Sequence, residues 1–146
     1  MEEDWGIAMA FEVAKRPLHQ TFPKRKPEKS KDYLAFLHEL PCIITGKYGV
    51  QAAHLSYSAT QYGHYGRGKQ TKASDRWALP LCPEEHNRQH SMNEAEFWRQ
   101  AGINPHIVAL TIWGMFTEYG MDAVPFATAI INQGLVGRSA YQEVAE

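Results

Sequence analysis

Cysteine is scarce in this sequence, which has only Cys42 and Cys82 among its 146 residues. Two cysteines are too few for the disulfide framework of a small secreted protein. The sequence also lacks any apolar run near the roughly 20 residues that a membrane-spanning helix needs. Its first residues, Met1-Glu2-Glu3-Asp4, are acidic where a secretion signal is basic. We therefore expect a cytoplasmic protein with no membrane function.

Positive charge is nearly absent from both ends of the chain. Residues 1–12 contain four acids and no Lys or Arg, and residues 77–146 contain eight acids and three bases. Residues 13–76, in contrast, contain twelve bases and four acids, although the formal net charge of the whole chain is only −1. Because a base placed on a phosphate releases counterions, this segment favours a polyanionic partner such as DNA. A solvated charged surface is the simpler alternative.

The length suits one domain, and the patterning predicts an α+β fold with a largely helical C-terminal half. We expect a flexible arm over residues 1–31, first acidic and then basic, a main domain over 32–120, and a C-terminal helix and tail over 121–146 packed on that domain. Helical spacing predicts a helix over 32–40, capped by Ser30 and stopped by Pro41. Further helices are expected after Asn93, from Asn104-Pro105 to Gly120, and over 122–133 with an end at Gly134.

The middle of the chain predicts short strands. Residues 42–45 and 50–54 are expected to form two strands joined by a glycine-bearing turn, so that His54 ends the second strand. Residues 55–74 form a long loop that contains Gly63, Gly66 and Gly68. A short strand over 76–81 then leads to a helix that Pro83 begins.

The helix after Pro83 carries His86 and His90, which are one helical turn apart. Side chains at this spacing project from one face, so both imidazoles can reach one cation. Two surface histidines are the common alternative. A β-hairpin that ends in a histidine, followed by a loop, a short strand and this helix, is the order of a ββα-metal finger, in which an imidazole activates water beside a bound cation.

Residues 33–113 resemble the Ref-like HNH nucleases of phages and prophages, whose best-known member cleaves DNA at RecA-bound sites. The order and spacing of several short motifs carry the resemblance. They are Tyr33-Leu34-Ala35-Phe36-Leu37, Leu40-Pro41-Cys42, Ala53-His54-Leu55, Gly66-Arg67-Gly68-Lys69, Lys72-Ala73-Ser74-Asp75, Pro80-Leu81-Cys82, His86 with His90, Glu96-Phe97-Trp98 and Gly102-Ile103-Asn104-Pro105.

The resemblance implies a ββα-metal (HNH) core and a DNA endonuclease of phage recombination or DNA processing, active in a bacterial host cell on DNA or RecA-coated DNA. It makes His54 the general base, and His86 and His90 metal ligands. Asp75 takes the place of the usual HNH asparagine, where it either ligates the metal or holds the His54 imidazole; a simple turn or strand-start cap is its structural alternative. Oxygen ligands favour Mg²⁺ or Mn²⁺, whereas paired imidazoles favour Zn²⁺ or Ni²⁺.

Three positions depart from the HNH pattern. Ala53 stands where many members have a further ligand, and Thr45 and Glu85 stand where a zinc knuckle has its second cysteines. A structural zinc is therefore not expected, and Cys42 and Cys82 are predicted to be buried thiols near one another. These departures support an alternative function, a catalytically silent DNA-binding or phage-assembly protein on the same scaffold.

Basic side chains of the arm and the loop are the expected phosphate contacts. His64 is expected to be a solvated loop residue, and His106 is assigned no role. The predicted nucleic-acid-binding residues are Lys24, Arg25, Lys26, Arg67, Lys69, Lys72 and Arg76.

Overall fold

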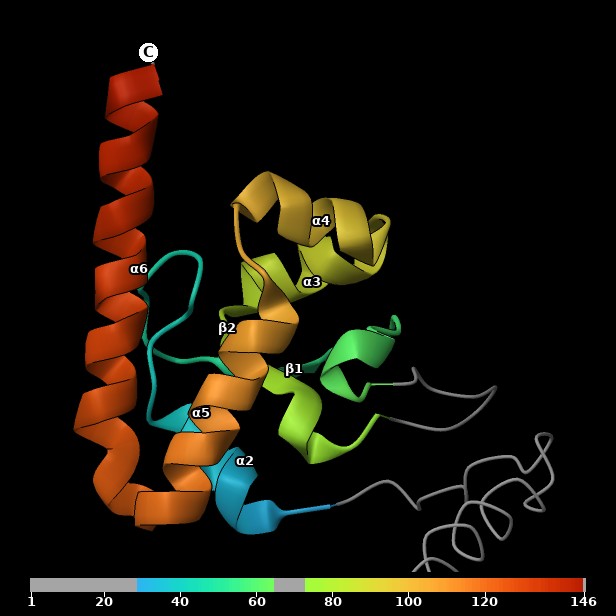
Figure 1. Cartoon of the computed structure of the whole chain (residues 1–146), viewed down its shortest axis with the longest axis vertical. Coiled ribbons are helices and arrows are strands. Elements are labelled where there is room, and N and C mark those ends of the chain that lie inside the picture. Colours follow the sequence, from blue (N-terminus) through green and yellow to red (C-terminus); the bar gives the residue numbers. More distant parts are fainter. Residues whose placement is uncertain (1–28, 65–72, 146) are drawn as a thin grey trace, which may run out of the picture.

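The computed structural model describes residues 29–64 and 73–145, and the side chains within them up to residue 140. The described chain is α+β, as the sequence predicts, and it contains five α-helices and one two-stranded sheet (Figure 1). Six of the predicted nucleic-acid contacts lie outside the described residues, and Arg76 lies within them. None of the described helices is both long and apolar enough to cross a membrane. The predicted contacts outside the described residues are Lys24, Arg25, Lys26, Arg67, Lys69 and Lys72.

Helix α2 (Lys31–His38) forms where the sequence predicts it. The Ser30 side chain accepts a hydrogen bond from the Tyr33 backbone N–H, which satisfies one of the free donors of the first turn. Tyr33, Phe36 and Leu37 form the buried face of the helix. The Tyr33 ring packs edge-on against Trp113, with ring centroids 4.8 Å apart, so α2 is fixed to helix α5 (Pro105–Tyr119).

The sheet consists of β1 (Gln51–His54) and β2 (Ala78–Leu81), which pair antiparallel with His54 opposite Ala78. The predicted strand over 42–45 is wrong, because this segment is a turn. The turn closes through a bond from Gly46 N–H to the Cys42 carbonyl, and the Cys42 sulfur accepts from the N–H groups of Ile44 and Thr45. Local hydrogen bonds thus satisfy the groups that a strand would use.

The predicted strand over 76–81 is confirmed with a later start. Asp75–Trp77 form a 3₁₀ turn, and β2 follows directly. The loop between the strands also contains local structure, a 3₁₀ turn at Thr60–Tyr62 and a bridge between Ala59 and His64. Because β1 and β2 are neighbours across this loop, both of its ends lie next to each other at one edge of the sheet.

Three helices begin at the predicted caps. Helix α3 (Pro83–Ser91) has Pro83 in its first turn. Helix α4 (Glu94–Ala101) begins at Asn93, whose side chain accepts from the Glu96 N–H at 3.0 Å. Helix α5 (Pro105–Tyr119) begins at Asn104 and ends at Gly120. Cap chemistry in the sequence therefore located these helix starts correctly.

Helix α6 (Val124–Ala145) continues through Gly134, where the sequence predicts an end. Tertiary contacts explain the difference. A Cβ on Gly46 would lie 3.1 Å from the Leu135 side chain, and Arg138 donates to the Ile43 carbonyl at 2.5 Å. These contacts hold the second half of α6 against the turn over 42–47, which compensates the roughly 1 kcal/mol cost of a helical glycine.

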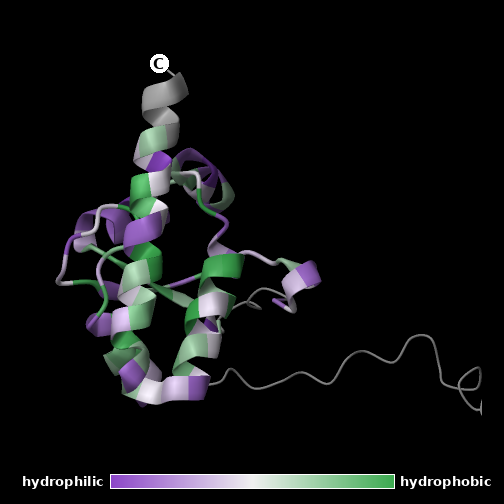
Figure 2. Cartoon of the chain, turned by 60° about the vertical axis from the view of Figure 1, so that its left-hand side comes forward, coloured by the Kyte–Doolittle hydropathy of each residue, from purple (hydrophilic) through white to green (hydrophobic). Residues whose placement is uncertain are grey.

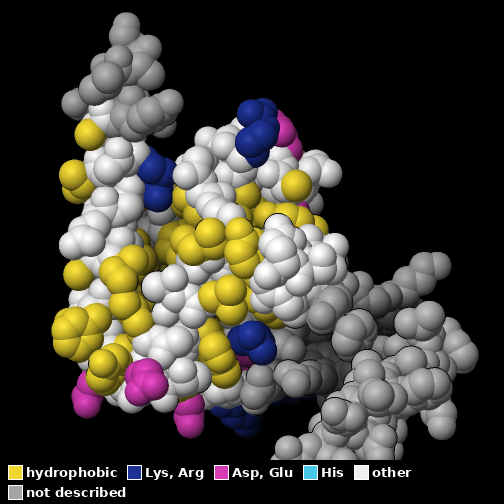
Figure 3. All heavy atoms as spheres, in the orientation of Figure 1, with side chains coloured by type: hydrophobic (Ala, Val, Ile, Leu, Met, Phe, Trp, Pro, Cys, Tyr) yellow, Lys and Arg dark blue, Asp and Glu magenta, His cyan; other side chains and the backbone are white. Residues whose placement is uncertain are grey.

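The core lies between α2, the sheet, α5 and the first half of α6. Figure 1 shows α5 and α6 side by side, joined by the short turn Gly120–Ala123. Both helices are rich in hydrophobic and neutral residues (Figure 2), and some of these stay at the surface along α6 (Figure 3). Phe126 and Val136, for example, are 57% and 69% exposed. Helices α3 and α4 form a separate pair on the other side of the sheet from α6 (Figure 1).

Candidate active site at the edge of the sheet

His54 lies at the end of β1, and Asp75 lies just before β2, so the antiparallel pairing brings them together. The His54 Nε2–H donates to Asp75 Oδ1 at 2.8 Å. The His54 side chain is 30% exposed, whereas the Asp75 side chain is only 12% exposed. A partly exposed imidazole is thus anchored from behind by a carboxylate, which is the arrangement that directs a catalytic histidine.

The other Asp75 oxygen, Oδ2, accepts from the Ser30 backbone N–H at 2.7 Å. Both oxygens therefore have a partner, and the carboxylate joins the start of α2 to the end of β1. Since a carboxylate only accepts, the proton of neutral His54 must sit on Nε2, and Nδ1 keeps its lone pair. The geometry favours Asp75 as the residue that orients His54, over a role as a turn cap.

His86 and His90 lie on one face of α3 with their Nε2 atoms 3.0 Å apart. The Nδ1–H of His86 donates to Gln51 Oε1 at 2.8 Å, so β1 contributes to the position of this ring. That bond leaves the His86 Nε2 lone pair directed at His90. In metal sites a ligating histidine usually donates its second nitrogen to an acceptor in this way.

Burial lowers the pKa of His86, and the nearby His90 and His54 rings lower it further. A lowered pKa keeps His86 neutral near pH 7, which is the form that binds a cation.

The two histidine nitrogens fit a shared divalent cation. Two nitrogens about 2.1 Å from one octahedral ion, at right angles around it, lie about 3.0 Å apart, whereas the tetrahedral angle usual for zinc separates them by about 3.4 Å. In the described part of the chain, no three His, Cys, Asp or Glu side chains gather into a ready metal site. The protein therefore offers two nitrogen ligands, and water or substrate oxygens would complete the coordination.

A polar network supports the back of the site. Gln89 is buried in α3 and its side-chain N–H₂ donates to the His54 carbonyl at 3.4 Å and to Glu94 at 2.8 Å. Glu94 also accepts from the backbone N–H and the hydroxyl of Ser56 and from the Trp98 indole. These bonds fix the chain that follows His54 to helix α4.

His64 is buried, with 3% of its surface exposed, so the prediction of a solvated loop histidine is wrong. Its Nδ1 is 3.0 Å from His106 Nε2, and its ring stacks on Trp77 at 4.7 Å. Burial and the neighbouring His106 lower the pKa of His64 to about 4. Burial also lowers the pKa of His106. Both rings are therefore neutral at pH 7 and form a structural pair.

The remaining predicted residues fall in different surroundings. Arg76 is half-buried, with its guanidinium 5.1 Å from the Trp77 ring centre. Cys42 and Cys82 are buried free thiols, as predicted, and the Thr45 hydroxyl lies 3.6 Å from the Cys82 sulfur. A hydroxyl is a poor ligand for zinc.

Sequence reasoning missed Gln51, Gln89, Glu94 and His106. Gln51 precedes His54 by three residues on a strand and had no pattern of its own. Gln89 and Glu94 act through long-range hydrogen bonds, which no local spacing indicates. The buried partner of His64 is 42 residues away.

Comparison with known families gives one match. A family described as protein of unknown function (DUF968) matches residues 9–116, which is more than half of the chain. No curated protein and no solved structure matches the chain.

Proposed function

Because the chain belongs to the DUF968 family of proteins of unknown function, we propose a function from its own residues: a divalent-metal-dependent DNA endonuclease that hydrolyses phosphodiester bonds. The observation that carries this proposal is the His54–Asp75 pair at the end of β1, together with the His86–His90 pair on the helix that follows β2. In chain order the site residues lie on β1, the 3₁₀ turn before β2, and α3.

His54 is the general base in this proposal. Asp75 holds the proton on Nε2, so Nδ1 can take a proton from a water molecule that attacks the phosphorus. The Asp75 carboxylate also stabilises the imidazolium that forms in this step. Partial exposure of His54 leaves room for the water, whereas the buried carboxylate keeps the ring from rotating.

His86 and His90 would hold the cation through their Nε2 atoms, with Gln51 orienting His86. A bound divalent ion supplies charge that stabilises the phosphate oxygens and the leaving oxygen. Imidazole ligands favour Zn²⁺ or Ni²⁺, while a coordination shell completed by oxygens suits Mg²⁺ or Mn²⁺.

The proposed DNA contacts lie near Ser30 and Asp75 in the sequence. The chain enters the domain at Lys29-Ser30, and Ser30 itself bonds Asp75, so the basic residues that precede it are joined to the domain beside the site. Arg76 follows Asp75 directly. Lysines and arginines in these positions would neutralise phosphates on either side of the scissile bond. By the resemblance, RecA-coated DNA is a further proposed substrate form.

Cutting of supercoiled plasmid in Mg²⁺, Mn²⁺, Zn²⁺ or Ni²⁺ tests the proposal. We expect wild-type protein to nick the plasmid with at least one of these ions, and His54→Ala to be about 100-fold slower or worse, because the general base is lost. DNA binding should be nearly unchanged. His38→Ala is the matched control, since His38 is an exposed histidine on α2.

Equal activity of wild type and His54→Ala would contradict the proposal. Wild-type protein that binds DNA and cuts with none of the four ions would support the alternative, a catalytically silent DNA-binding or phage-assembly protein. The departures at Ala53, Thr45 and Glu85 are the observations that favour this alternative.

A further inference from the structure

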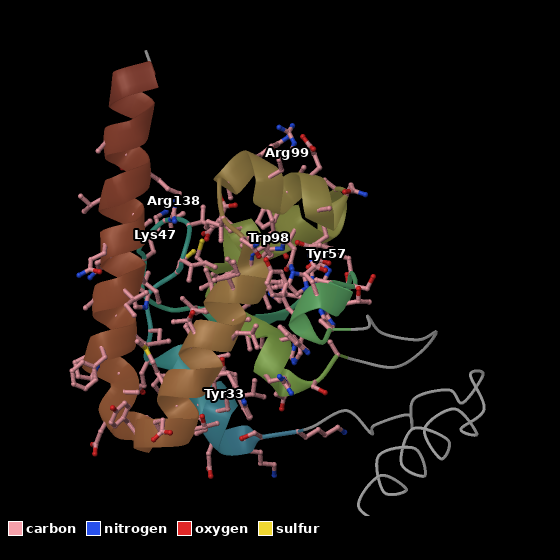
Figure 4. The ribbon with its side chains drawn as sticks, in the orientation of Figure 1. Tyr33, Lys47, Tyr57, Trp98, Arg99 and Arg138 are labelled. Atoms are coloured by element: carbon pink, nitrogen blue, oxygen red, sulfur yellow. The ribbon has the colours of Figure 1, made fainter. Side chains whose placement is uncertain are left out.

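A pocket of about 420 Å³ lies beside the candidate active site, between the loop after β1 and the junction of α4 and α5. Four aromatic rings line it, together with Arg99 and Asn104. Figure 4 shows Tyr57 and Trp98 close together at this junction, with Arg99 reaching outward from α4. The catalytic proposal uses none of these side chains. The four rings are Tyr57, Tyr62, Trp98 and His106.

The aromatic rings are held in place by contacts within the protein. The Tyr62 ring stacks on His106 at 6.0 Å and 14°, and its hydroxyl accepts from the Asn104 side chain at 3.1 Å. Tyr57 packs edge-on against the same His106 ring at 4.9 Å. Trp98 is fully buried, so it forms the base of the pocket. A ligand ring would thus meet walls that need no rearrangement, which reduces the entropic cost of binding.

Tyr62 is only half-buried, since one face of its ring covers His106. The rest of the ring borders the pocket and is available to a flat ligand. Arg99 lies exposed at the rim in an ion pair with Glu96, which accepts from its Nε at 2.7 Å and from its Nη2. Aromatic faces with a neighbouring guanidinium are the groups with which proteins bind the bases and phosphates of single strands.

The pocket is also physically connected to the catalytic pair. Tyr57 follows His54 by three residues, so their Cα atoms are within about 11 Å of each other. Gln89 bonds both the His54 carbonyl and Glu94, and Glu94 accepts from the Trp98 indole at 3.5 Å. A nucleotide strand with a phosphate at His54 can therefore place a base from a nearby nucleotide in the pocket.

We propose that this pocket binds an unpaired nucleobase of single-stranded DNA close to the phosphodiester bond at His54. Both faces of a paired base are covered by its neighbours in a duplex, so only an unstacked base can enter. The inference rests on the proposed function, which places the cut phosphodiester bond at His54. It defines the substrate class as DNA with a single-stranded segment next to the cutting site.

Binding of a 12-nucleotide single strand that contains 2-aminopurine tests the pocket. The full-length protein is used with His54→Ala, which prevents cutting. We expect Tyr62→Ala to weaken binding about tenfold or more and to abolish the fluorescence change of the stacked 2-aminopurine. Tyr62→Phe keeps the ring and should retain both signals. Tyr119→Ala is the matched control, because Tyr119 is 61% exposed at the end of α5.

A 12-base-pair duplex and the mononucleotide dAMP complete the experiment. Duplex affinity should not change with Tyr62→Ala, and dAMP should bind far more weakly than the strand. Arg99→Gln should weaken single-strand binding with the fluorescence change retained. Unchanged strand binding by Tyr62→Ala, or equal losses for strand and duplex, would overturn the proposal, as would dAMP binding as tightly as the strand.

The two proposals fail separately. Plasmid cutting by wild-type protein depends on His54 and tests the endonuclease. The fluorescence signal depends on Tyr62 and is measured with His54→Ala, where no cutting occurs. If Tyr62→Ala had no effect on strand binding while the wild-type protein cut plasmid normally, only the pocket proposal would be rejected.

Discussion

Two groups of histidines in this protein have opposite surroundings. His54, His86 and His90 form the edge group. The His54 ring is partly exposed and bonds Asp75, and the His86 ring bonds Gln51. His64 and His106 form a buried pair that stacks on Trp77. Residue type alone does not separate them. The difference is that His54 bonds a carboxylate that can stabilise an imidazolium, whereas burial outweighs the nearby Glu94 charge for His64 and His106.

In the proposed function, the edge group transfers protons and the buried pair packs the core. A charged His64 would lose hydration and face the neighbouring Arg76 charge. A charged His54 would lie 2.8 Å from Asp75. The experiments below test that division, in order of expected effect.

Asp75→Asn should produce the largest effect, a loss of about 100-fold or more in the nicking rate. The asparagine amide has one oxygen that accepts and one nitrogen that donates, whereas Asp75 accepts through two separate oxygens. The amide therefore cannot replace both bonds, to His54 Nε2–H and to Ser30 N–H, so either the ring or the start of α2 loses its anchor. The rate of plasmid nicking measures this effect. Circular dichroism at the same concentration provides the control for folding, and an undiminished rate would show that the edge group needs no carboxylate.

Acid should destabilise the fold through the buried pair. The pKa of His64 is about 4 in the folded protein and about 6.5 when unfolded, so the unfolded state binds the proton more readily. The contribution of neutral His64 to the free energy of unfolding is therefore fully present above about pH 6.5. It falls by about 2 to 3 kcal/mol as the pH decreases towards 4. Urea unfolding at pH 7 and pH 4.5 measures it. His64→Gln should reduce the change of the unfolding free energy with pH. If the variant and the wild type changed equally, His64 would not be the source of the acid sensitivity.

His90→Ala should weaken binding of Zn²⁺ or Ni²⁺ about 10- to 100-fold, because one of two imidazole ligands is removed. Isothermal titration at pH 7.5 measures the affinity. The matched control is His38→Ala, which alters an exposed histidine on α2. Affinity equal to that of the wild type would mean that the 3.0 Å approach of His86 and His90 is a hydrogen bond and not a cation site.

Ser30→Ala should give the smallest effect, a loss of about 1 kcal/mol in unfolding free energy. The mutation removes the cap on the Tyr33 N–H, while the backbone N–H that bonds Asp75 remains. Nicking activity should therefore change less than stability does. Thermal unfolding and the plasmid assay measure the two, and a large loss of nicking with little loss of stability would place the Ser30 hydroxyl itself in the edge group.

Much of the secondary structure could be predicted because its signals are local. Ser30, Asn93 and Asn104 cap helices with their own side chains, and Pro83 and Pro105 occur in first turns. The strand over 42–45 could not be rejected in this way, because its residues have high β-propensity and the turn is fixed by the Cys42 sulfur and by Arg138, 95 residues from Ile43.

The residues of the candidate site could be proposed from the sequence, but the hydrogen bonds between them could not. The spacing of His86 and His90 places them on one helix face, and the resemblance selected His54 and Asp75. Which nitrogen of His54 carries the proton depends on a bond across 21 residues, and the role of Gln51 depends on one across 35. The pocket has no sequence pattern, since its rings come from separate segments of the chain.

The sequence by itself determined the helix starts, the shared face of His86 and His90, and the concentration of positive charge over residues 13–76, because these follow from spacing, cap chemistry and composition. Only the tertiary structure decided which histidines are exposed and which are buried. Antiparallel pairing of β1 with β2 brings Asp75 to His54, while the packing of the loop on α5 encloses His64 with His106. Burial and partners, and not residue type, determine the protonation of a histidine.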